Sequence, residues 1–166
     1  MAERRIGYLG LGSNVGDSAG HLRAAIELLE AEGIEVDAVS SAYVTEPVGE
    51  VLDQPDFLNA AIRIRTDLEP EELLDACKRV EAERGRQFDL PRHSPRPLDV
   101  DLLLLDDLEM RTVRLTLPHS EVMNRRFVLV PLLELDPELT LPDGLRLADT
   151  LDAAFEGQRV QRSGRL

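Results

Sequence analysis

The chain has 166 residues, 43% of them hydrophobic, and 32 acidic against 19 basic side chains give it a formal net charge of −13. This length suits one compact domain, and the acidic charge disfavours nucleic acid as a partner, because such binding depends on neutralising phosphates. No apolar run approaches the roughly 20 residues of a membrane-spanning helix, and the lone Cys77 cannot form an internal disulfide, so we expect a cytoplasmic protein.

The first predicted elements are a strand, a turn and a helix. The apolar run Ile6 to Leu11 favours a buried strand, and the small and polar residues 12–16 after it predict a turn. Asp17 or Ser18 can cap the N-terminus of a helix with a regular apolar stripe. Gly33 can end that helix in a left-handed conformation. The chain therefore begins with a strand that leads directly into a helix.

Two extended segments and a second helix follow. Residues 34–45 look extended, and apolar and polar side chains alternate along residues 57–66. Such alternation predicts a strand with one face in the core and the other face open to water. Asp67 and Pro70 indicate the start of an amphipathic helix, which should end near Gly85.

A loop rich in proline and arginine, residues 85–97, leads into a fourth predicted strand at residues 98–105. The order β-α-β-β-α-β predicts an α+β fold of the ferredoxin-like type, an antiparallel sheet with both helices on one face. Residues 111–151, with a short strand, a Pro-His turn, an apolar run and a last short helix, should add to the same core. We expect one domain over residues 1–157 and a disordered basic tail over residues 158–166.

Basic side chains gather in one short stretch of this acidic chain. Within thirteen residues there are four arginines and a single acid, Asp89. A solvated loop is the alternative interpretation, but in a protein of this charge we favour a local site for a polyanionic ligand. Because the loop has little apolar surface, we expect it to be open in the free protein and to close over bound ligands. The arginines are Arg84, Arg86, Arg92 and Arg96.

Asp99 and Asp101 are two residues apart on the fourth predicted strand, so their carboxylates point to the same face. Among apolar neighbours, two close carboxylates repel each other and are costly to desolvate unless a cation neutralises them. Carboxylates together with substrate phosphates suit Mg²⁺. Two solvated aspartates are the alternative. Arg96, three residues earlier, favours the metal, because phosphoryl transfer needs a cation and a phosphate-binding charge together.

The glycine-rich turn and the histidines give weaker indications. Residues 12–14 could offer backbone N–H groups, but the chain has neither a P-loop nor a Rossmann glycine pattern. His21 fits a surface position on a helix and His93 an ordinary loop position, whereas Pro118 could aim His119 at a phosphate. The chain has no cysteine–histidine cluster, so we expect no zinc site.

Taken in order along the chain, these residues resemble the hydroxymethyldihydropterin pyrophosphokinase family. The likeness extends from about Ile6 to Leu151, and its motifs are individually weak. Their collinear order makes the resemblance specific. The motifs are Gly12-Ser13-Asn14 with Gly16, Tyr43-x-Thr45-x-Pro47-x-Gly49, Gln54-Pro55-Asp56-Phe57-Leu58-Asn59, Arg96-Pro97-Leu98-Asp99-Val100-Asp101, Pro118-His119, and Asn124-Arg125-x-Phe127.

The resemblance implies an enzyme of folate biosynthesis that transfers pyrophosphate from ATP to the hydroxymethyl group of a dihydropterin and leaves AMP. It also implies two Mg²⁺ ions held by Asp99 and Asp101, with Arg86 and Arg96 as further catalytic residues beside the transferring phosphates. The pterin would be recognised at Thr45, Pro47, Val48, Phe57, Asn59 and Phe127. ATP would be bound at Glu81, Arg86, Arg92, Arg96, Leu102, Arg114, Thr116 and His119.

The partners expected are therefore small molecules, with no nucleic acid and no membrane, for a chain that is a monomer or a weak dimer. Two other function classes stay open. One is a ligand-sensing or RNA-binding module, since ferredoxin-like folds host many functions. RNA fits poorly, because the net charge is −13 and no aromatic pair matches an RNA-recognition strand. The other is a different magnesium-dependent phosphoryl or nucleotidyl transferase, which the nucleotide released from ATP would distinguish.

Overall fold

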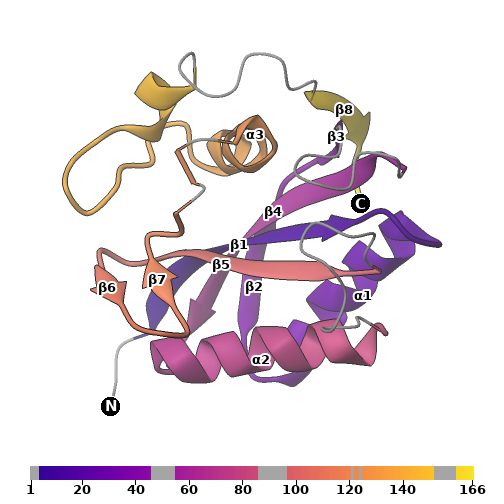
Figure 1. The fold of residues 1–166 in the computed structure, drawn as a ribbon, viewed down its shortest axis with the longest axis horizontal. Helices are drawn as coiled ribbons and strands as arrows, with labels where there is room; N and C mark the ends of the chain where they lie inside the picture. Colours follow the sequence, from indigo (N-terminus) through magenta and orange to yellow (C-terminus); the bar gives the residue numbers. More distant parts are fainter. Residues whose placement is uncertain (1–3, 46–54, 86–96, 121, 124, 152–159) are drawn as a thin grey trace.

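An antiparallel sheet lies at the centre of the computed structural model (Figure 1). The structure describes residues 4–45, 55–85, 97–120, 122–123, 125–151 and 160–166. Within these residues the sheet has six strands: β1 (Arg5–Ser13), β2 (Glu35–Val39), β3 (Ala42–Thr45), β4 (Phe57–Thr66), β5 (Asp99–Leu105) and β8 (Val160–Gly164). Their order is β5-β1-β4-β3-β8, and β2 also pairs with β4.

Two helices, α1 (Ser18–Ala31) and α2 (Pro70–Glu83), cover one face of the sheet (Figure 1). The side chain of Asp17 caps α1 by accepting a hydrogen bond from the backbone of its first turn, at 3.1 Å, as predicted. The cap of α2 is Glu69, which forms a reciprocal capping box with Glu72. Asp67 therefore lies outside the helix start that the sequence led us to expect.

A third helix, α3 (Arg126–Leu135), covers the opposite face of the sheet (Figure 1). Its Leu129 and Leu132 are fully buried in a second apolar cluster with Tyr8 and Ala61 from the strands. The middle of β4 is consequently buried on both faces. The prediction of a half-buried strand is wrong there, because the apolar run of the C-terminal region folds back as a helix onto the face expected to meet water.

Short elements complete the described part of the chain. Strands β6 (Met110–Arg111) and β7 (Thr116–Leu117) form a small hairpin next to β5, and the 3₁₀ helix η1 (Leu147–Thr150) packs beside α3. The α+β class with an antiparallel sheet is as predicted. No helix within the described residues is both long and apolar enough to cross a membrane.

Two predicted boundaries were wrong. Strand β1 continues to Ser13, through residues that the sequence assigned to a turn. The C-terminal residues 160–164 are not a disordered tail but strand β8, which pairs with β3. An edge strand offers unpaired backbone groups to any extended segment, so this pairing does not need the apolar periodicity that the tail lacks.

Candidate active site

Strand β1 lies between β4 and β5, and two of its glycines separate the polar side chains of its neighbours. Gly12 is paired with Asn59 on β4 and with Asp99 on β5. Gly10 is paired with Ala61 on one side and Asp101 on the other. Directly paired residues present their side chains to the same face of a sheet. The two aspartates and Asn59 therefore face one another across a strip of β1 that carries no side chains.

The absence of a side chain at Gly12 is a steric requirement. A Cβ atom built at this position would lie 2.6 Å from the Oδ1 atom of Asn59. Real Cβ atoms essentially never come this close to another atom, so alanine here would displace the amide. Glycine at positions i and i+2 inside a strand is a signal of such close approach. The sequence predicts Gly10 correctly within a strand and assigns Gly12 to a turn, and it identifies neither as part of the floor of the site.

A first hollow opens over this strip, on the face that α3 covers. Phe127 and Val128, from the first turn of α3, line it opposite the floor formed by β1, β4 and β5. Asn59 is 8% exposed, and its Nδ2 donates a hydrogen bond to Thr45 Oγ1 at 2.6 Å. This bond fixes the amide plane and leaves Oδ1 directed across Gly12. The complete lining is Gly10, Leu11, Gly12, Asn59, Ala60, Ala61, Asp99, Asp101, Leu103, Phe127 and Val128.

A second hollow lies on the other side of Asp101, between β5, α2 and the β6–β7 hairpin. Of the predicted ATP-binding residues, it brings together Leu102, Arg114, Thr116 and His119. Asp101 belongs to both hollows, so the carboxylate forms their common boundary. The complete lining is Leu74, Lys78, Val100, Asp101, Leu102, Arg114, Leu115, Thr116, His119 and Ser120.

Arg114 is held at the edge of the second hollow by acids of α2. Its guanidinium donates a hydrogen bond to Asp75 and lies 4.0 Å from a carboxylate oxygen of Glu71. The hydrogen bond and charge of Asp75 raise the pKa of Arg114, so this side chain stays cationic throughout the physiological range. The Asp75 carboxylate thus holds the guanidinium of Arg114 in place beside the second hollow.

Glu81 lies beneath the second hollow and does not line it. Its side chain is 0% exposed, and Oε2 accepts a hydrogen bond from the backbone N–H of Val100 at 2.8 Å. The ammonium of Lys78 lies 3.5 Å from Oε1. Val100 stands between the two aspartates on β5, so Glu81 fixes the strand segment that carries them.

Burial, with the nearby charges of Glu81 and Asp101, raises the pKa of Cys77 to about 12 and keeps this thiol inert.

Other predicted site residues are placed as follows. Phe57, half-buried, lies two residues before Asn59 on β4, and its ring reaches within 3.9 Å of the Cβ position at Gly12. Within the described residues, no group of three or more histidine, cysteine or acidic side chains could hold a metal ion. Asp99 and Asp101 thus form a pair of carboxylates that would need ligands from elsewhere. Pro47, Val48, Arg86, Arg92 and Arg96, with most of the arginine-rich loop, lie outside the described residues.

Comparison with known proteins places this arrangement in context. A family model described as 7,8-dihydro-6-hydroxymethylpterin-pyrophosphokinase matches residues 8–137. A curated protein of Methylorubrum extorquens, 2-amino-4-hydroxy-6-hydroxymethyldihydropteridine pyrophosphokinase, is 47% identical over 135 residues, which are 81% of this chain and 84% of that protein. A protein of the same name from Pseudomonas aeruginosa is 41% identical over 152 residues, 90% of this chain and 93% of its own.

Solved structures share the fold. The crystal structure of wild-type HPPK-DHPS from Plasmodium falciparum superimposes with a TM-score of 0.70, at 13% sequence identity, over 92% of this chain. The match covers 45% of that chain, so the present protein spans less than half of its length. At this identity the similarity shows the fold alone, an antiparallel sheet covered by helices.

Proposed function

This chain belongs to the 7,8-dihydro-6-hydroxymethylpterin-pyrophosphokinase family, and we propose that it catalyses the reaction for which the family is named. It transfers pyrophosphate from ATP to the hydroxymethyl group of 6-hydroxymethyl-7,8-dihydropterin in folate biosynthesis. The oxygen of the alcohol forms a bond to the β-phosphorus of ATP, and the bond from that phosphorus to the α,β-bridging oxygen breaks. AMP leaves with the bridging oxygen, and the alcohol loses its proton.

The observation that carries the proposal is the pair of hollows with Asp101 between them. One is narrow and is lined by Phe127 and two glycines, groups that can pack against a flat heterocycle. The other is lined by an arginine, a threonine and a histidine, and it suits a nucleotide with charged phosphates. A reaction between two substrates needs their reacting atoms held together, and the carboxylates mark the place where the two ligands would meet.

In the first hollow, Asn59 recognises the pterin. Its amide is oriented by Thr45, so the free Oδ1 can accept from an N–H of the heterocycle and the second N–H of Nδ2 can donate. Phe127 offers a flat apolar surface above the ring plane, and Phe57 extends this surface at the start of β4. By the family resemblance we also assign Pro47 and Val48 to pterin binding.

The chemistry of the carboxylate pair fits magnesium. Asp99 and Asp101 are hard oxygen ligands on one face of β5, and they supply too few donors to enclose a cation by themselves. Magnesium bound by one or two carboxylates takes its other oxygens from water and substrate phosphates. We therefore assign two Mg²⁺ ions to this pair. When bound, they supply positive charge that lowers the pKa of the alcohol and screens the phosphates.

The second hollow holds ATP with the triphosphate directed at Asp101. Arg114 is cationic and placed to pair with phosphate, while Thr116 and His119 present hydrogen-bonding groups from the hairpin and the turn that follows it. Arg86, Arg92 and Arg96 belong to the same ATP-binding group, with Arg86 and Arg96 on the transferring phosphates. The proton of the alcohol passes to solvent or to an aspartate.

We assign the core a ferredoxin-like topology. The order β5-β1-β4, with β2 and β3 both paired to β4, supports this assignment when β2 and β3 are counted as one interrupted strand. Both helices of that unit lie on one face (Figure 1). We place the protein in the cytoplasm, acting as a monomer on small molecules.

The nucleotide released from ATP tests the proposal. The chain is incubated with ATP, magnesium and the pterin alcohol, and the products are separated by chromatography. We expect AMP and a pterin diphosphate in equal amounts, formed only when the alcohol is present. Release of ADP would indicate an ordinary phosphoryl transferase, and alcohol-independent release of AMP would indicate hydrolysis; either result would overturn the assignment.

A further inference from the structure

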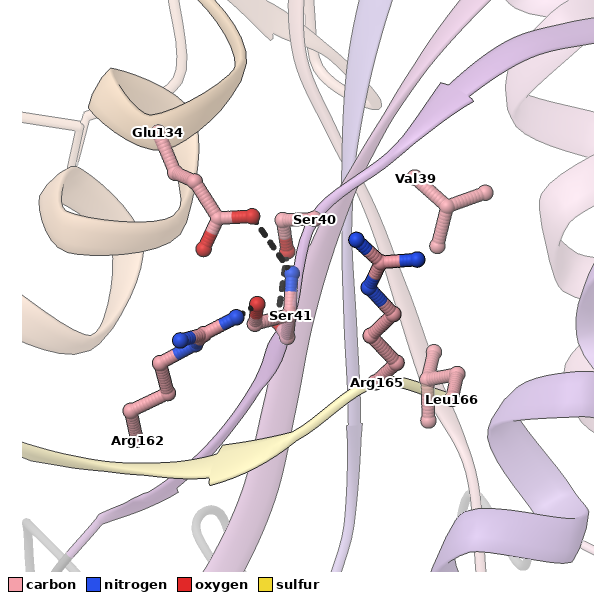
Figure 2. A pocket seen from close by; sticks show the side chains of 7 residues that line it. All are labelled: Val39, Ser40, Ser41, Glu134, Arg162, Arg165 and Leu166. Carbon is pink, nitrogen blue, oxygen red and sulfur yellow. Dashed lines mark hydrogen bonds between the residues drawn. The ribbon is translucent and has the colours of Figure 1, made fainter.

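The β-ladder is interrupted between β2 and β3, and side chains replace the missing backbone partners. The Ser40 hydroxyl accepts from the backbone N–H of Ala61 at 2.8 Å and donates to the carbonyl of Ser41 at 2.7 Å. The backbone N–H of Ser41 donates to Oε2 of Glu134 on α3 at 2.8 Å (Figure 2). Ser41 is 3% exposed, so this donor would otherwise be buried without its ladder partner. A carboxylate on α3 thus takes the place of the missing backbone acceptor at this interruption of the sheet.

The other oxygen of the same carboxylate binds β3 a second time. Tyr43 donates its hydroxyl hydrogen to Oε1 of Glu134, so the carboxylate bridges two points of the strand. Nearby, Arg162 on β8 donates to the hydroxyl of Ser41 at 2.9 Å (Figure 2). These contacts and the charge of Arg162 outweigh partial burial and lower the pKa of Glu134, so the bridge is ionised at neutral pH. We call the contacts of Glu134 with Ser41 and Tyr43 the α3–β3 bridge.

Both elements joined by the α3–β3 bridge carry residues close to the first hollow, which we now call the pterin hollow. On β3, Tyr43 is paired with Asn59, and Thr45 two residues later accepts the hydrogen bond that orients the Asn59 amide. On α3, Phe127 lies seven residues before Glu134, two helical turns away on the same side of the helix. Helix α3 therefore carries the ring, and β3 carries the threonine that orients the amide facing this ring across the hollow.

The α3–β3 bridge determines where α3 lies along the sheet more than it holds the helix onto the sheet. Leu129 and Leu132 are fully buried and already attach α3 by apolar packing. Apolar packing has no direction, so it tolerates small shifts of a helix along the sheet. A carboxylate held by two donors of one strand permits a single register, and a ring a fraction of an ångström out of place would fit a flat ligand poorly.

We propose that Glu134 is a positioning residue for the pterin: through Ser41 and Tyr43 it sets the register of α3 against β3 and so the spacing between Phe127 and the Thr45–Asn59 pair. This inference rests on the proposed function. The bridge does not touch the ATP hollow, so its loss should affect one substrate and spare the other.

Equilibrium binding of each substrate, measured separately by calorimetry, tests the inference. Tyr43→Phe removes one hydroxyl from the bridge and should raise the pterin Kd roughly threefold to tenfold, the effect of one hydrogen bond. Glu134→Ala should raise it further, while the ATP Kd stays within about twofold in both variants. Glu134→Gln keeps an oxygen for Ser41 and an amide group for Tyr43, so it should restore pterin binding to within about twofold of the unaltered chain.

The matched control is Tyr8→Phe. Tyr8 lies on β1 and donates its hydroxyl hydrogen at 3.3 Å to Asp136, the residue after α3, which is not part of the bridge. The Tyr8→Phe substitution should leave the Kd of both ligands unchanged. Normal pterin binding by Tyr43→Phe and Glu134→Ala would overturn the inference, and so would equal losses for pterin and ATP. Failure of the unaltered chain to release AMP in the presence of the pterin alcohol would overturn the proposed function and this inference with it. If Glu134→Ala does not fold, Tyr43→Phe still decides.

Discussion

Single residues determine the shape of the proposed pterin hollow, the charge at its edge and the hydrogen bonds that hold it in place. At Gly12 the decisive quantity is a distance, because a methyl group there would compete with the Asn59 oxygen for the same space. At Asp99 and Asp101 it is charge, because two carboxylates on one strand face repel each other until a cation binds. At Tyr43 it is the hydrogen bond that its hydroxyl donates to Glu134. Each of these effects can be measured by itself.

Gly12→Ala should greatly weaken pterin binding and leave ATP binding close to normal. The new Cβ would lie 2.6 Å from Asn59 Oδ1, so the amide must move away from Thr45 and the floor of the hollow must rise. We expect at least a tenfold increase in the pterin Kd, on the order of 1.4 kcal/mol. Calorimetry with each ligand measures it. Unchanged pterin binding would mean that the heterocycle does not lie over β1.

Asp99→Ala and Asp101→Ala should each abolish turnover without unfolding the chain. Either change removes a proposed metal ligand and also relieves the repulsion between the carboxylates, and neither aspartate belongs to the two apolar cores. The measurements are AMP formation and the thermal midpoint. Asp107→Ala is the control, because Asp107 is exposed just beyond the end of β5. Full activity of either site variant at limiting magnesium would refute the metal assignment.

Tyr43 should make stability fall at alkaline pH. Burial and the hydrogen bond to Glu134 raise its pKa from 10.0 to about 12. A group whose pKa is higher in the folded state stabilises it fully below the unfolded pKa, and this stabilisation is lost as pH rises through the folded pKa. The unaltered chain should thus lose more unfolding free energy between pH 10 and 12 than Tyr43→Phe does. Urea unfolding of both proteins across this range checks it, and parallel curves would contradict it.

At the scale of elements, three strands bring the residues of the candidate site together. Strand β5 carries the aspartates, β1 supplies the open floor, and β4 carries Asn59, all in a fixed antiparallel register. Helix α3 covers this floor, and α2 supports β5 from the other side through Glu81. The geometry of the site therefore depends on how the strands are held as much as on the side chains that face the substrates.

Glu81→Ala should reduce both stability and turnover, whereas Glu81→Gln should be close to normal in stability. The alanine variant leaves the buried N–H of Val100 without its carboxylate acceptor, which costs about 1–3 kcal/mol. Since Val100 stands between Asp99 and Asp101, the same loss should loosen both carboxylates. Urea unfolding and kcat provide the measurements. A stable Glu81→Ala chain with normal kcat would show that β5 needs no support from α2.

At the scale of the whole molecule, the two apolar cores form the walls of the candidate site but do not include its carboxylates. One core lies between the sheet and the α1–α2 pair, the other between the sheet and α3, and neither includes Asp99 or Asp101. Helices on both faces bury the centre of the sheet without contribution from the carboxylates. The fold should for this reason be stable without bound ligands, which would add only their own binding free energy to it.

Removal of magnesium by a chelator should stop the reaction while the thermal midpoint shifts by no more than about 1 °C in the absence of substrates. The reason is that a site for a few hard ligands, open to water and substrate, adds little to two packed cores. Differential scanning calorimetry with and without the chelator gives the result. A midpoint lowered by many degrees would assign the metal a structural role.

Much of the fold could be predicted from local patterns along the chain. The apolar run that begins at Ile6, the alternation along residues 57–66 and the Asp17 cap predicted β1, β4 and α1, because each depends on neighbours within a few residues. The same locality explains the errors. The polar face of β4 was expected to meet water, since nothing near it in sequence reveals that α3 returns to cover it.

The sequence by itself determined the α+β class, the carboxylate pair on β5 and the family, because strand periodicity and ordered motifs are properties of the chain. Only the tertiary structure decided that Gly10 and Gly12 form the floor of the site, that Glu81 supports β5 from below, and that residues 160–164 form β8. These facts depend on partners distant along the chain, some by more than a hundred residues, and no local pattern encodes such contacts. The α3–β3 bridge between Glu134 and Tyr43, 91 residues apart, is of the same kind.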